Sequence, residues 1–132
     1  MRLSQARAEL ALAQGKWSDA IAEATTVVDQ SRLRHRVKYE ALSLATRARA
    51  RHHLGLRAAV DDAKSAARVA RRLADPALLV ECLSVLLEVD GTDSVLTEAQ
   101  LTTRVVLNAL SHESLRRAFL ENTSSRFPGV HA

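Results

Sequence analysis

Apolar residues recur every three or four positions along nearly the whole chain, which is the spacing of one face of an α-helix. The first such stripe is Leu3, Ala6, Leu10 and Ala13, and the next begins at Trp17. No stretch of four to eight residues alternates apolar and polar positions as a half-buried strand would. The pattern therefore predicts an all-α protein of seven helices.

Breaks between the stripes group the predicted helices into pairs. Gly15 and Gly55 end the first and third helices. Asp75–Pro76 starts the fifth, because Asp caps a helix well and Pro suits the first helical position. We expect one domain over residues 1–127 and a disordered tail over 128–132. The domain would contain three antiparallel hairpins and a capping helix, at about 2–31, 36–73, 76–110 and 112–126.

Two of the hairpin turns have similar sequences. The segment from Gly15 to Ala24 aligns with the segment from Gly55 to Ala63 after a one-residue gap. Each segment joins the first and second helices of a hairpin, and the two lie about forty residues apart, a spacing found in helical solenoids. The sequence thus indicates an array of repeated hairpins.

The first hairpin resembles a tetratricopeptide unit. Small residues, Ala8, Ala20 and Ala24, lie where its two helices would cross. Gly15 is at the turn, and the bulky Trp17 follows it. The second hairpin keeps Gly55, Ala59 and Ala63 but has Arg57 in place of the aromatic residue, and the third keeps only the helix–turn–helix pattern. The resemblance implies a right-handed solenoid in which small side chains let paired helices nest closely.

The whole chain is also similar to divergent helical-repeat regions near the ends of large bacterial regulators. These include signal-transduction ATPases, nucleotide-cyclase-linked regulators and transcription activators of the MalT type. The segment from His112 to Leu120 resembles the closing helix of such regions. The resemblance implies sensing or partner binding and supplies no catalytic residue. Because no capping sequence precedes the first helix, we expect the chain to be an excised piece of a longer array.

Charge is distributed unevenly behind the formal net charge of +4. Residues 32–72 hold twelve Lys or Arg and three acidic residues, whereas residues 73–132 have a net charge of −4. The basic centre is compatible with solvated helix faces or with an acidic partner. The single cysteine, Cys82, lies in an apolar run that predicts a buried thiol, and no stretch approaches the roughly twenty apolar residues of a membrane span. We expect a cytoplasmic protein without a membrane partner.

No set of residues points to catalysis. The four glycines are scattered and form no phosphate-binding loop. His52 and His53 are adjacent, so on a helix they point in different directions and cannot share a metal ion. The pair Asp61–Asp62 lies beside a helix start, where carboxylates favour the helix dipole. The sequence therefore predicts no catalytic residue, no cofactor and no metal, and a protein that is not an enzyme.

The favoured hypothesis is a protein–protein interaction scaffold. In it, the first helix of each hairpin contributes to one concave groove. Arg47, Arg51 and His52, on the central one of these helices, are the candidate contacts for an acidic protein or peptide. One alternative is a homodimer that pairs the N-terminal stripe containing Leu3 with its copy. Another is nucleic-acid binding by the central Arg cluster. It is the weaker interpretation, because Tyr39 is the only aromatic residue available there for stacking.

Overall fold

The computed structural model describes residues 1–110 and 113–124 of the 132-residue chain. This described part contains seven α-helices and no strand, which confirms the all-α prediction. The helices are α1 (Arg2–Ala13), α2 (Trp17–Leu33), α3 (Val37–His53), α4 (Ala58–Leu73), α5 (Pro76–Asp90), α6 (Asp93–Ala109) and α7 (Glu113–Ser124). Residues 125–132, with the predicted tail 128–132, lie outside the described part.

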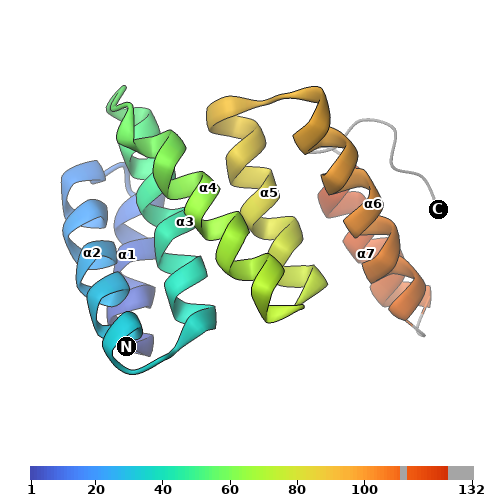
Figure 1. The fold of residues 1–132 in the computed structure, drawn as a ribbon, viewed down its shortest axis with the longest axis horizontal. Coiled ribbons are helices and arrows are strands. Elements are labelled where there is room, and N and C mark those ends of the chain that lie inside the picture. The colour runs from blue at the N-terminus through green and yellow to red at the C-terminus, as the bar shows by residue number, and fades with distance from the viewer. Residues whose placement is uncertain (111–112, 125–132) are drawn as a thin grey trace.

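The helices form a row, and each packs against the next with its direction reversed (Figure 1). Contacts also link α1 to α3 and α3 to α5, whereas the backbones of α2 and α4 stay further apart. The helices α1, α3 and α5 therefore form one layer. The helices α2, α4 and α6 lie on the other side, nearer the viewer in Figure 1. The pair α1–α2 lies at one end of the row and the pair α6–α7 at the other.

Gly15 and Gly55 shape two of the turns in the same way. Their φ angles are +73° and +71°, values that cost a residue with a side chain about 1 kcal/mol or more. The amide of Gly15 donates to the carbonyl of Leu12, and the next amide, of Lys16, donates to Ala11. The same two bonds recur around Gly55. This pattern satisfies the last carbonyls of a helix, so α1 and α3 end with one backbone geometry.

Alanine makes up much of the contact between helices. The residues predicted to let helices cross closely, Ala8, Ala20, Ala24, Ala59 and Ala63, are all buried. Because an alanine side chain extends only one carbon from the backbone, it permits a short distance between helix axes. Larger apolar side chains fill the core where α5 packs on its neighbours, among them Leu44, Leu78, Leu83, Val85 and Leu86.

Side-chain caps fix the starts of α5 and α6. The carboxylate of Asp75 accepts a hydrogen bond from the amide of Leu78 at 3.1 Å, with Pro76 at the first helical position. The hydroxyl of Thr92 accepts one from the amide of Val95 at 3.2 Å. Both caps satisfy amides that have no partner inside the helix. They therefore define where α5 and α6 begin.

Candidate interaction site

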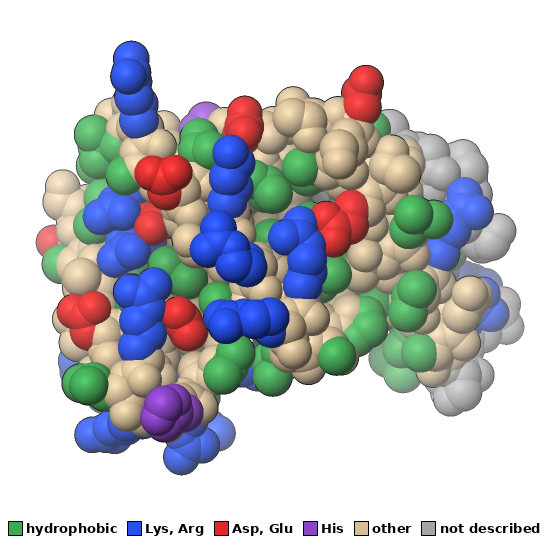
Figure 2. Space-filling view, in the orientation of Figure 1, with side chains coloured by type: hydrophobic (Ala, Val, Ile, Leu, Met, Phe, Trp, Pro, Cys, Tyr) green, Lys and Arg blue, Asp and Glu red, His purple; other side chains and the backbone are tan. Residues whose placement is uncertain are grey.

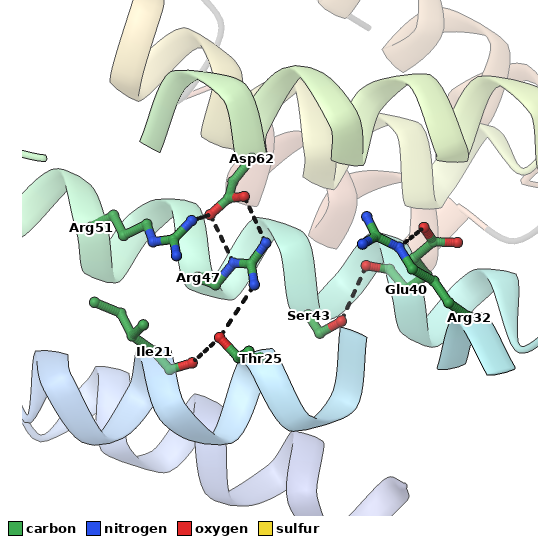
Figure 3. Close-up of polar contacts among 8 residues, drawn as sticks. All are labelled: Ile21, Thr25, Arg32, Glu40, Ser43, Arg47, Arg51 and Asp62. Atoms are coloured by element: carbon green, nitrogen blue, oxygen red, sulfur yellow. Dashed lines mark hydrogen bonds and ion pairs between the residues drawn. The ribbon is translucent and has the colours of Figure 1, made fainter. Parts of the chain in front are cut away.

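Two of the three predicted partner contacts, Arg47 and Arg51, lie in an internal network of hydrogen bonds and ion pairs (Figure 3). The Arg47 guanidinium donates from Nε and Nη2 to the two oxygens of Asp62, both at 2.9 Å. Arg51 donates from Nη1 to the same carboxylate at 2.7 Å. Arg47 Nη1 also reaches Thr25 Oγ1 at 3.2 Å, and that hydroxyl donates to the Ile21 carbonyl at 2.7 Å.

This network joins three helices, because Thr25 belongs to α2, Arg47 to α3 and Asp62 to α4. Only 13% of the Arg47 side chain and 7% of the Asp62 side chain are exposed. Leaving one member of so enclosed a pair without its partner costs several kcal/mol. Arg47 and Arg51 thus point to the seam between α2 and α4, where Asp62 pairs with both. Contact of these two residues with an acidic partner stays a prediction.

The third predicted contact, His52, is exposed on the last turn of α3. Its neighbour His53 stacks on the indole of Trp17, with ring centroids 4.1 Å apart and ring planes 2° from parallel. Trp17 thus connects the start of α2 to the end of α3. His52 stays a predicted partner contact, but without Arg47 as a free cation beside it.

A groove of about 270 Å³ lies along the layer of α1, α3 and α5. Apolar side chains from all three helices line it, and charged side chains stand among them. The apolar ones include Leu12, Leu42 and Val85, and the charged ones are Glu9, Arg49 and Glu81. The groove of the first helices thus exists, but its cation is Arg49. That residue lies two positions from both Arg47 and Arg51 and so on a different side of α3.

Polar contacts hold the walls of this groove together. Gln5 of α1 is buried, and its Nε2 donates to Glu9 Oε1 at 3.0 Å and to Thr46 Oγ1 of α3 at 3.3 Å. Arg49 Nε donates to Glu88 Oε2 of α5 at 3.3 Å. The contact between Arg49 and Glu88 joins partly exposed side chains, so it contributes little to stability and leaves Arg49 able to change partner.

Cys82 borders the groove, but its side chain is buried. Burial, and to a smaller extent the nearby carboxylate of Glu81, raises the pKa of the thiol to about 12. The thiolate is the nucleophilic form of cysteine, and at neutral pH almost none is present here. Cys82 therefore serves as a small apolar side chain in the folded protein.

A second hollow, of about 280 Å³, lies between the end of α4, the start of α5 and the outer side of α6. Its walls are mostly apolar and include Ala70, Leu79, Leu101 and Val105. Leu101 and Val105 are 61% and 54% exposed. These two side chains lie four residues apart on α6 and so on one face of the helix. In Figure 2 hydrophobic side chains lie on both sides of an indentation between the parts of the surface over α4 and over α6.

Basic side chains gather over α4 on the same face (Figure 2). Arg71 donates two hydrogen bonds to Glu98 of α6, at 2.7 and 2.6 Å. The bonds from Arg71 lower the pKa of the Glu98 carboxyl, and the bonds to Glu98 raise the pKa of Arg71. This pair bridges α4 and α6 beside the second hollow. Lys64, Arg68 and Arg72 are the exposed cations that remain on α4.

Comparisons with protein families, with curated proteins and with solved structures find no match. Across residues 1–110 and 113–124, no three His, Cys, Asp or Glu side chains come together as a metal site. In the same ranges, no helix combines the length and the apolar character that a membrane crossing needs. Function is therefore inferred from the surfaces described above.

Proposed function

We propose that this chain is a non-catalytic protein–protein interaction scaffold, built as a right-handed, tetratricopeptide-like array. Packing of α3 on both α1 and α5 supports an array, because it repeats one contact along the row. The shared geometry of the turns at Gly15 and Gly55 also supports it. A function inside a larger bacterial regulatory or signalling protein, in the cytoplasm, is part of the same proposal.

The observation that carries this proposal is the groove along α1, α3 and α5. Three helices that are separate in the sequence contribute to one hollow, so a bound segment would contact α1, α3 and α5 together. Leu12 and Leu42 are partly exposed and offer an apolar surface, and burying apolar area stabilises a complex by about 25 cal/mol per Å² before the costs of ordering. Arg49 and Glu9 supply charges of both signs that orient the segment. A peptide with one apolar side chain and polar flanks fits this chemistry.

The test is a selection of displayed random dodecapeptides on the purified chain, followed by affinity measurements on a blocked variant. Ala13 lines the groove and is exposed, so Ala13→Trp should fill the hollow without disturbing the core. We expect Ala13→Trp to weaken the selected peptides by tenfold or more. The matched control is Ala6→Trp, an exposed alanine of the same helix outside the groove. Peptides that bind both variants equally well would disprove the groove as the site.

A second candidate function is self-assembly through α1, and one observation favours it. Leu3 and Leu10 are large, apolar and exposed, whereas the residues forty positions later, Ser43 and Ala50, are fully buried in α3. The face of α3 that contains Ser43 and Ala50 is thus buried against neighbouring helices, whereas the equivalent face of α1 is exposed. We propose that a second copy covers it. Light scattering over a range of protein concentrations tests this, and a strict monomer at high concentration would exclude it.

A further inference from the structure

Two features of the α4–α6 surface lie next to each other without an assigned role. One is the apolar hollow bounded by Leu79, Leu101 and Val105. The other is a strip of cations on α4, formed by Lys64, Arg68 and Arg72. Neither feature belongs to the groove along α1, α3 and α5. They suggest a second binding surface on the opposite layer of the row.

The hollow has room for one apolar side chain. Its floor is Leu79 of α5, and its two walls come from α4 and α6. Arg71 and Glu98 span these walls as a hydrogen-bonded pair, so the hollow is braced before any ligand binds. Leu101 and Val105 present about half or more of their surfaces to solvent. Covering them would remove apolar surface from water at little cost in reorganisation.

The cation strip follows from helix geometry. Lys64, Arg68 and Arg72 are four residues apart, so they line one side of α4 at intervals of about 6 Å. Among the described residues, neither Arg68 nor Arg72 forms an ion pair within 4.0 Å, and Lys64 reaches Asp90 only at 4.0 Å. In an extended peptide, alternate side chains are about 6.6 Å apart on one face. The spacing of the strip therefore suits alternate carboxylates of an extended chain.

We propose that this surface binds an acidic segment of a partner protein, with one apolar side chain in the hollow and carboxylates along the strip. The apolar walls call for a side chain such as leucine or valine. The unpaired guanidinium groups of Arg68 and Arg72 call for negative charge, which they bind by charge-assisted hydrogen bonds.

A protein segment fits better than a nucleic acid. Single-stranded nucleic acids are held by bases stacked on aromatic side chains as well as by phosphate contacts. Residues 58–109, which contain α4, α5 and α6, include no Phe, Trp or Tyr. The hollow beside the strip is also lined by aliphatic side chains, which suit an aliphatic anchor rather than a base.

The experiment uses the full chain with Ala13→Trp, so that the groove along α1, α3 and α5 is blocked and only other surfaces capture ligands. A displayed library of random dodecapeptides is selected on this variant. We expect enrichment of peptides with net negative charge and an aliphatic residue. Because the groove is blocked, this result is separate from success or failure of the proposed scaffold function. Enrichment of no such class would overturn the proposal.

Two pairs of variants then locate the bound peptide. Leu101→Ser should weaken an enriched, synthesised peptide by about tenfold, whereas Leu33→Ser, at another exposed leucine, should not. Lys64→Glu combined with Arg68→Glu should weaken it by a similar factor that shrinks at high salt. The control, Arg2→Glu with Arg7→Glu, makes the same change in net charge on α1.

Thermal melts of every variant show that it is folded, because all the substituted residues are exposed. Equal loss in both members of a pair would mean a non-specific effect and would overturn the assignment of the site. A fluorescein-labelled single-stranded dodecanucleotide is the remaining probe. Tight binding of that oligonucleotide, lost with Lys64→Glu and Arg68→Glu, would replace the acidic protein segment by a nucleic acid and so refute the proposal.

Discussion

Asp61 and Asp62 are neighbours near the start of α4, and the fold gives them different environments. Asp61 is exposed, whereas Asp62 is buried and accepts hydrogen bonds from two arginines of α3. Successive residues on a helix point about 100° apart, so one faces solvent and the other faces α3. The sequence showed the two carboxylates and the arginines, but not that Asp62 forms ion pairs with Arg47 and Arg51.

Removing the Asp62 carboxylate should therefore destabilise the protein far more than removing that of Asp61. For Asp62→Ala we expect the free energy of unfolding to fall by about 3 kcal/mol, because Arg47 stays enclosed without its partner. For the control Asp61→Ala we expect a change of about 0.5 kcal/mol or less, from the helix dipole alone. Urea denaturation followed by circular dichroism measures both. Similar losses for the two variants would contradict a structural role for the network.

Single residues also differ in how far their positions in the candidate site could be predicted from the sequence. His52 at the surface and Cys82 in the core follow from local sequence pattern, and the structure agrees with both. Arg49 was missed as the groove cation because the groove is defined by α1 and α5, which lie far from it in the chain. Charge alone could not separate Arg49 from Arg47. Only the neighbouring helices distinguish them.

At the scale of single elements, helix ends are where local sequence was most informative. Gly15 and Gly55 adopt the left-handed backbone that glycine favours. Ala74, at the end of α4, adopts the same region with φ of 55°, although it has a side chain. His35 does so as well, with φ of 54°. Neither of these two turns has a glycine at the left-handed position, so glycine spacing does not mark them as it marks the turns at Gly15 and Gly55.

Replacing Ala74 by glycine should consequently stabilise the protein. The substitution relieves a left-handed conformation that costs alanine about 1–2 kcal/mol, less the extra freedom that glycine has in the unfolded chain. We expect a net gain of about 0.5–1 kcal/mol in the free energy of unfolding. Ala22→Gly, at an exposed position inside α2, should instead lose about 1 kcal/mol. Opposite signs in denaturant titrations are the expected result, and a loss in both variants would argue against the left-handed turn.

For the whole molecule, the row arrangement gives the helices unequal numbers of neighbours. Within the described residues, α3 packs against α1, α2, α4 and α5, whereas α1 contacts α2 and α3 alone. In such a quasi-linear array each unit is stabilised mainly by its nearest neighbours. Local opening should therefore begin at the ends of the row and reach α3 last.

Hydrogen exchange followed by mass spectrometry tests this order. We expect the amides of α3 to exchange at least about tenfold more slowly than those of α1, because opening α3 breaks contacts with four helices. The buried thiol of Cys82 offers a second readout, since it should react with a thiol reagent only after α5 opens. Equal protection along the whole row would instead mean that the helices unfold as one cooperative unit.

The sequence by itself determined the helices of this protein, because helix formation depends on apolar spacing, caps and glycine turns that lie within a few residues of each other. The same local information placed Asp75–Pro76 at a helix start and alanines at the helix contacts. Only the tertiary structure decided which charges are free, because pairing depends on side chains brought together from different helices. Asp62 thereby pairs with Arg47 and Arg51 and Glu88 pairs with Arg49, while Arg68 and Arg72 are left exposed without an ion pair among the described residues.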